Sequence, residues 1–208
     1  MICSYQYYLL EKLRSKVEPI MNKIGLGLSK LGMTPMMLSI LAVIFSIISA
    51  FFYSNLVQFN INSVIPNQAL GAIFLLVAGL CDMLDGAIAR VTKKSTLKGA
   101  FIDSTFDRVT EIIVFSGVLI GQYAESILIF FAITLSMLVS YSRTKAEAIN
   151  IDLRGIGIAE RSERILILCL FSFFNEVRYA IIIIIILSSI TFMERFISVM
   201  KKADKTNT

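Results

Sequence analysis

The chain has 208 residues, of which 56% are hydrophobic and 17% are charged, and it contains no histidine. This balance is more apolar than that of soluble domains and is typical of proteins that cross a membrane several times. The net charge of +5 would suggest nucleic acid as a partner of a soluble chain. Here we attribute it to membrane topology and expect no nucleic-acid binding.

The rare residue types narrow the possible chemistry. The three cysteines form no CxxC pair and no close cluster, so they support neither a disulfide framework nor a thiolate metal site. Because histidine is absent, general-base and metal-ligand roles fall to carboxylates, lysines or hydroxyls.

Residues 1–33 mix basic and apolar side chains without a continuous apolar run or a small-residue cleavage site. This pattern predicts an amphipathic juxtamembrane helix on the membrane surface rather than a cleaved signal.

Six long apolar stretches follow, each near the ~20 residues that a helix needs to cross the hydrocarbon layer. Within lipid, every backbone polar group must be paired inside its own segment, so helices are expected. We therefore predict an all-α integral membrane protein, with a six-transmembrane-helix bundle over 34–200 and a basic tail over 201–208. The expected spans are 35–53, 68–90, 99–121, 125–147, 160–175 and 178–198.

Lysine and arginine are distributed unevenly among the connections. They concentrate in the N-terminal segment, the second and fourth connections and the C-terminal tail, whereas the first, third and fifth connections together contain only Arg178. By the positive-inside rule, we expect a multi-pass protein of the cytoplasmic membrane with both termini and the even-numbered connections in the cytoplasm.

Four aspartates in two adjacent spans are the main candidates for chemistry, because charged residues inside a span are costly and usually functional. Asp82 and Asp85 are three residues apart, and Asp103 and Asp107 are four apart, so each pair lies on one helical face. Both pairs lie near the same connection, and we expect the four carboxylates to meet at one depth near the cytoplasmic surface.

Four like charges in a medium of low dielectric require protonation or bound cations. Oxygen ligands suit hard ions such as Mg²⁺ or Mn²⁺, and two ions could clamp a diphosphate during phosphoryl transfer. A purely structural alternative would pair the aspartates with Arg90 and Arg108.

The segment from Asp82 to Asp107 reads D-x2-D-G-x2-A-R-x8-G-x3-D-x3-D. It resembles the signature of the CDP-alcohol phosphotransferases at every fixed position. The resemblance implies a six-helix bundle, commonly a homodimer, whose polar pocket opens to the cytoplasm. It also implies that Asp82, Asp85 and Asp103 hold metal, and that Asp107 completes a second metal site and acts as general base.

The same resemblance suggests contacts to the CDP-activated lipid. Gly86, Arg90 and Thr96 fall at donor-binding positions of the family, and the stretch from Thr34 to Ser39 resembles another donor-binding segment. Family members often carry Asn or Asp directly after the proline, where this chain has Met36. Contact there is expected from backbone amides or the Ser39 hydroxyl, so the predicted segment comprises Met36, Met37, Leu38 and Ser39.

The acceptor is inferred from residues 140–164, which resemble the branch of the family that makes phosphatidylinositol phosphate or its archaeal ether-lipid counterpart. In that branch, basic residues bind the phosphate of inositol phosphate, and guanidinium groups suit this role. The corresponding residues here are Arg143, Lys145, Arg161, Arg164 and Arg195. Basic residues at cytoplasmic helix ends are also expected for topology alone.

Other functions stay open at this stage. Transfer to glycerol phosphate is the nearest alternative, with serine or another polar alcohol further behind. An intramembrane acidic cluster could also serve a divalent-cation or proton-coupled transporter, although no inverted repeat is evident. A catalytically inactive adaptor is disfavoured because every carboxylate of the signature is present.

Overall fold

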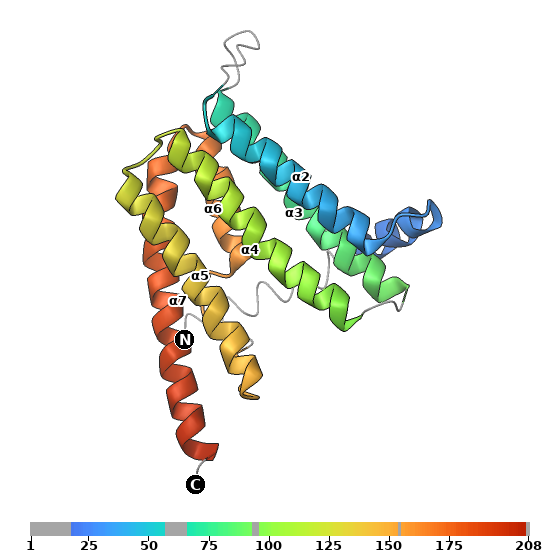
Figure 1. The fold of residues 1–208 in the computed structure, drawn as a ribbon, viewed down its shortest axis with the longest axis vertical. Helices are drawn as coiled ribbons and strands as arrows, with labels where there is room; N and C mark the ends of the chain where they lie inside the picture. Colours follow the sequence, from blue (N-terminus) through green and yellow to red (C-terminus); the bar gives the residue numbers. More distant parts are fainter. Residues whose placement is uncertain (1–17, 57–65, 93–95, 154, 207–208) are drawn as a thin grey trace. The chain divides into compact units, whose positions relative to one another are not determined.

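The computed structural model describes residues 18–56, 66–92, 96–153 and 155–206. Every regular element in these ranges is a helix (Figure 1). A helical stretch covers residues 18–30, and the part of the predicted juxtamembrane segment before it lies outside the described residues. The remaining helices are α2 (Pro35–Tyr53), α3 (Asn67–Val91), α4 (Leu97–Ile120), α5 (Ser126–Ala148), α6 (Arg161–Phe173) and α7 (Val177–Thr206).

The helices lie where the apolar stretches predicted them, and their ends differ from prediction by a few residues, except that α7 runs on into the predicted basic tail. Four helices, α2, α3, α5 and α7, are long and apolar enough to cross a membrane. Helix α4 carries Asp103, Asp107, Arg108 and Glu111 within its length, and α6 has 13 residues. The chain is thus an all-helical membrane protein with four candidate spans among its described residues.

Local sequence signals set several helix ends. Thr34 precedes α2, and its hydroxyl accepts a hydrogen bond from the Met37 amide at 3.3 Å. Thr96 caps α4 in the same way through the Gly99 amide at 3.0 Å. Side-chain oxygens at this position satisfy backbone donors that the first helical turn leaves unpaired. Gln122 and Asn175, in the short turns after α4 and α6, have positive φ angles of 55° and 62°.

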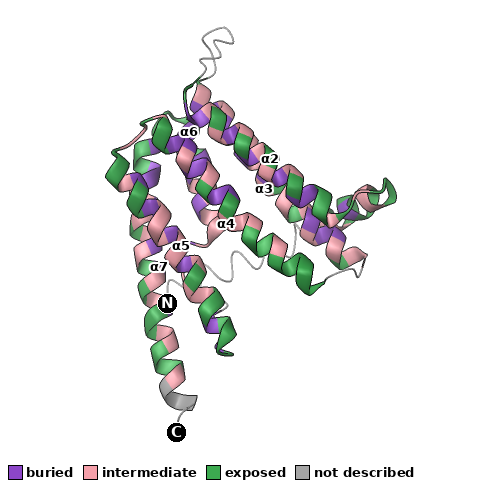
Figure 2. Ribbon diagram, in the orientation of Figure 1, coloured by how far each residue is buried: buried purple, intermediate pink, exposed green. Residues whose placement is uncertain are grey.

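Among the described residues, the helices fall into two compact units, one over 18–122 and the other over 123–206. In the first unit, α2 packs against both α3 and α4. From Ser39 onward, the buried residues of α2 recur every three or four positions, which places them on one face of the helix (Figure 2). The buried residues of α2 are Leu38, Ser39, Ala42, Ser46, Ser49 and Tyr53. A side chain at Gly117 of α4 would collide with the backbone of Ala50, so glycine permits the close approach of α2 and α4.

In the second unit, α5 and α6 each pack against α7. The connection between α5 and α6 is held against α7 by hydrogen bonds. The Thr191 hydroxyl accepts from the amides of Ile158 and Ala159, both at 3.0 Å. Lys202 donates to the carbonyl of Asp152 at 2.6 Å. This connection therefore has a defined path along the last helix.

Candidate active site

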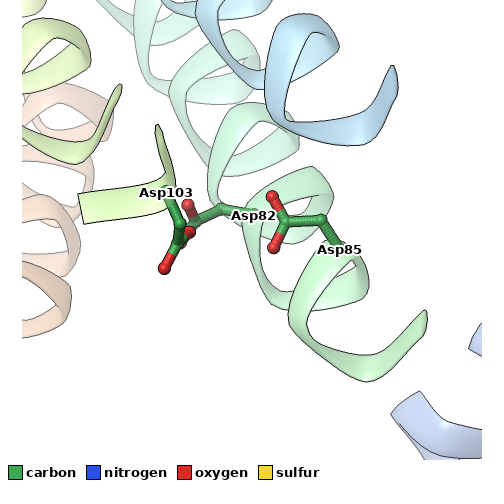
Figure 3. A group of neighbouring side chains, drawn as sticks. All are labelled: Asp82, Asp85 and Asp103. Carbon is green, nitrogen blue, oxygen red and sulfur yellow. The ribbon is translucent and has the colours of Figure 1, made fainter. Parts of the chain in front are cut away.

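Three of the four predicted aspartates converge in the first unit. Asp82 and Asp85 come from α3 and Asp103 from α4, and one carboxylate oxygen of each lies within 4.8 Å of the others. Figure 3 shows the three carboxylates pointing toward one another. Asp85 is buried, Asp82 is half-buried and Asp103 is exposed. The predicted meeting of carboxylates from the two helices is thus confirmed for these three residues.

The chemistry of this group fits a hard divalent cation. Three carboxylate oxygens at such short separations repel one another, and a bound cation would remove that repulsion. Mg²⁺ and Mn²⁺ prefer oxygen ligands, and Mg²⁺ usually takes a few carboxylates and completes its shell with water or substrate phosphate. The exposed side of the group, at Asp103, leaves room for such further ligands.

Asp85 has a partner on a neighbouring helix. The hydroxyl of Ser39 in α2 donates a hydrogen bond to Asp85 Oδ2 at 2.6 Å, and both side chains are buried. Ser39 was predicted to contact the lipid donor. Its hydroxyl contacts a carboxylate of the acidic group, and the donor contact stays a prediction.

Asp107 lies one helical turn beyond Asp103 in α4 and does not belong to the group of three. One of its oxygens is 3.7 Å from the guanidinium of Arg108, and its side chain is half-buried. The Arg108 guanidinium also donates to the carbonyl of Ser104. The predicted roles of Asp107 as second-site ligand and base stay predictions.

The predicted donor-binding residues occupy varied environments. Met36 and Met37 are exposed at the start of α2, whereas Leu38 is buried. Gly86 lies beside the acidic group in sequence, and a side chain added there would contact the Arg90 guanidinium. Arg90 is exposed, with its guanidinium 3.7 Å from Glu18, and Thr96 is the exposed cap of α4.

The predicted acceptor residues all belong to the second unit and divide into two kinds. Lys145 is exposed, and Arg143 and Arg161 are half-buried. Arg164 and Arg195, by contrast, are only 1% and 2% exposed. Arg164 donates to the carbonyl of Ala159 at 2.7 Å.

Arg195 makes three hydrogen bonds within the chain. It donates to the carbonyls of Ile156 and Val139, each at 2.9 Å, and to the carboxylate of Glu160 at 3.0 Å. Glu160 also pairs with Arg143 at 3.4 Å. Much of the donor capacity of Arg195 is therefore directed at its own unit.

Sequence reasoning missed Glu160 and Thr191, which hold the connection before α6. The signal available for Glu160 was its position directly before Arg161 and four residues before Arg164, since an acid is a natural partner for arginine. Thr191 lies inside an apolar helix, and nothing in its local sequence pointed to a connection 33 residues away.

The chain matches the family model of CDP-alcohol phosphatidyltransferases over residues 32–200. It belongs to that family. The match includes α2 to α6, most of α7 and the whole signature from Asp82 to Asp107.

Among curated proteins, the archaetidylinositol phosphate synthase of Pyrococcus horikoshii is 36% identical over 197 residues, which cover 94% of this chain and 99% of that protein. The archaetidylinositol phosphate synthase of Methanothermobacter thermautotrophicus is 35% identical over 138 residues, covering 64% of this chain and 70% of that protein.

Among solved structures, the phosphatidylinositol phosphate synthase of Mycobacterium tuberculosis with CDP-DAG bound has a TM-score of 0.72 and 27% identity, covering 87% of this chain and 94% of that one. The same enzyme in complex with manganese and citrate has a TM-score of 0.73 and 26% identity, covering 86% and 88%.

Proposed function

We propose that this membrane enzyme transfers a phosphatidyl or archaetidyl group from a CDP-activated lipid to inositol phosphate and releases CMP. The observation that carries the proposal is the convergence of Asp82, Asp85 and Asp103 within 4.8 Å at the family signature. Relatives that make archaetidylinositol phosphate or phosphatidylinositol phosphate support inositol phosphate as the acceptor.

Asp82, Asp85 and Asp103 would hold a divalent cation, with Asp107 contributing to a second. Bound Mg²⁺ or Mn²⁺ would supply positive charge that offsets the diphosphate and the charge developing on the leaving group. The structure of a relative with manganese supports this choice of metal. Asp82, Asp85 and Asp103 would hold a cation near the start of α4, where the exposed side chain of Asp103 is accessible to the diphosphate.

The reaction can be written with Asp107 as the base. A hydroxyl oxygen of inositol phosphate forms a bond to the lipid-bearing phosphorus of the donor. The bond from that phosphorus to the CMP phosphate breaks, and CMP leaves with the electron pair. The hydroxyl proton passes to the Asp107 carboxylate. Met36, Met37, Leu38, Ser39, Gly86, Arg90 and Thr96 form the proposed donor-binding set.

The basic residues Arg143, Lys145, Arg161, Arg164 and Arg195 are proposed to recognise the acceptor phosphate. Arg143 and Lys145 are the more accessible members of this set, as half-buried and exposed side chains near the end of α5. The buried Arg164 and Arg195 would contribute positive charge and support the connection before α6.

We further propose six membrane crossings, with α4 and α6 joining the four apolar spans. The termini and the reacting groups would face the cytoplasm, because basic residues concentrate on that side. The family resemblance supports a homodimer. Accessibility of single cysteines on either side of sealed vesicles tests the orientation, and mass measurement in detergent tests the dimer. Labelling of the termini from outside, or a monomeric mass, would contradict these assignments.

The transfer reaction is tested with purified protein, Mn²⁺ and either CDP-archaeol or CDP-diacylglycerol. We expect CMP release to require inositol phosphate, and mass spectrometry should find the acceptor phosphate still present in the lipid product. Product formed only with glycerol phosphate would overturn the acceptor. Cation flux without CMP release would overturn the enzymatic proposal itself.

The role of Asp107 is tested by Asp107→Asn. We expect transfer to fall by about 100-fold or more, because Asn cannot accept the hydroxyl proton. Binding of Mn²⁺ should persist through Asp82, Asp85 and Asp103, as measured by calorimetry. Near-normal turnover by this variant would rule out Asp107 as the base.

A further inference from the structure

Ser39 differs from four other helical serines in how its hydroxyl is used. Ser46, Ser116, Ser172 and Ser189 each donate to the carbonyl four residues earlier at 2.7 to 2.8 Å. The corresponding distance from Ser39 to the carbonyl of Pro35 is 3.2 Å, whereas Asp85 Oδ2 is 2.6 Å away. A hydroxyl has one proton to donate. The Ser39 proton is therefore directed at Asp85.

The setting makes this hydrogen bond strong and directional. Ser39 is 7% exposed and Asp85 is 5% exposed, so water competes little for either group. A bond from a hydroxyl to a carboxylate is shorter and stronger than one between neutral groups. It also connects two packed helices, so the position of α2 fixes the rotation of a side chain on α3.

We propose that Ser39 is a positioning residue which orients Asp85 for metal binding by holding its Oδ2. The inference rests on the proposed metal role of Asp85. It adds Ser39, which lies outside the signature segment, to the residues that shape the metal site. With Oδ2 fixed by the hydroxyl, the carboxylate presents a defined face to Asp82 and Asp103. Partners of this kind keep ligand side chains in the geometry that a cation requires.

This role differs from the donor contact that the sequence suggested for Ser39. A serine that contacts the CDP-lipid would influence the KM for that lipid. A serine that orients Asp85 would influence the affinity for metal when no lipid is present. The two roles can therefore be separated by measuring each quantity.

The test is a titration of the full-length protein in detergent with Mn²⁺ alone, followed by calorimetry or by electron paramagnetic resonance. For Ser39→Ala we expect the Kd for Mn²⁺ to rise by about 10-fold or more, as for other partners of metal ligands. Ser39→Thr retains the hydroxyl and should stay within about 3-fold of the unmodified protein. Any contact of Ser39 with the donor is measured separately, as the KM for CDP-lipid at saturating Mn²⁺.

Two serines of α2 are matched controls. Ser46→Ala removes a buried hydroxyl that bonds only within its own helix turn, to the carbonyl of Ala42. Ser49→Ala removes a buried hydrogen bond of 2.7 Å to the carbonyl of Gly71, which also joins α2 to α3. Neither variant should alter the Kd for Mn²⁺. If Ser49→Ala weakens Mn²⁺ binding as much as Ser39→Ala, the effect is one of helix packing and the inference is wrong.

The outcomes also distinguish this inference from the proposed function. An unchanged Kd for Mn²⁺ in folded Ser39→Ala would overturn the role of Ser39 alone, and a raised KM for CDP-lipid in that case would assign it to the donor. No saturable Mn²⁺ binding by the unmodified protein would overturn both proposals. If Ser39→Ala does not fold, Ser39→Cys replaces it, because a thiol has similar shape but is a weak donor. It too should weaken Mn²⁺ binding, and an unchanged Kd would refute the inference.

Discussion

The acidic group of the first unit and the buried arginines of the second unit differ in the groups that lie beside their charges. Asp82, Asp85 and Asp103 gather like charges within 4.8 Å. Arg164 and Arg195 are more deeply buried, yet their guanidinium groups donate to backbone carbonyls, and Arg195 also to Glu160.

The difference indicates what each region requires. Mutual repulsion of carboxylates is a cost that a bound cation removes, so the acidic group is built for a ligand. A buried guanidinium whose donors meet carbonyls and a carboxylate stabilises its surroundings without any ligand. Neutralising a charge should consequently change the stability of the two regions in opposite directions.

The largest effect on activity is expected for Asp85→Asn. Transfer should fall by more than about 100-fold, since loss of a metal ligand should exceed the usual effect of losing a ligand's partner. Without metal, the variant should be as stable as the unmodified protein or more stable by about 1 kcal/mol, because one of three repelling charges is removed. Thermal unfolding in detergent with chelator, together with CMP release, measures both quantities.

A surface carboxylate serves as the control for this variant. Glu125 forms an ion pair of 2.6 Å with Arg178, and both side chains are more than half exposed. Glu125→Gln should alter stability by less than about 1 kcal/mol. A clear loss of metal-free stability in Asp85→Asn would show that the acidic group is structural and would remove the contrast between the two regions.

The largest effect on stability is expected for Arg195→Met. The methionine fills similar space but removes the guanidinium bonds to the carbonyls of Ile156 and Val139, and among the described residues only the latter keeps another side-chain donor, the Ser142 hydroxyl. The loss should cost about 2 to 4 kcal/mol. Thermal unfolding with and without inositol phosphate measures the loss.

Arg143→Met is the matched control for Arg195. Arg143 pairs with Glu147 and Glu160, but its side chain is 39% exposed, so the stability loss should stay within about 1 kcal/mol. If Arg195→Met unfolds normally and only the KM for inositol phosphate rises, Arg195 serves the proposed acceptor site alone and does not stabilise its unit.

A smaller loss is expected for Gly157→Ala. Gly157 has a φ of +105°, and a side chain there would collide with Thr191. We expect a loss of about 1 to 3 kcal/mol and weaker docking of the connection on α7. Gly79→Ala is the control, because its added methyl group meets open space and alanine favours a helix. Equal stability of the two variants would contradict a fixed path for the connection.

The local features of the molecule followed from the sequence, whereas contacts between distant segments did not. Apolar length located the helices, and the spacing of Asp82, Asp85 and Asp103 on two helical faces predicted their convergence. The bond from Ser39 to Asp85 depends on the register of α2 against α3, which neither segment encodes alone. The burial of Arg195 likewise depends on carbonyls 39 and 56 residues away.

The most direct test of the proposed metal-dependent transfer measures CMP release from CDP-lipid and inositol phosphate as the Mn²⁺ concentration is varied. The unmodified protein and Asp103→Asn are compared with lipid and acceptor at fixed concentrations. We predict no release in chelator, saturable release with Mn²⁺ in the unmodified protein, and about a 100-fold or greater loss in the variant. Release that persists in chelator, or that is equal in the two proteins, would contradict the account.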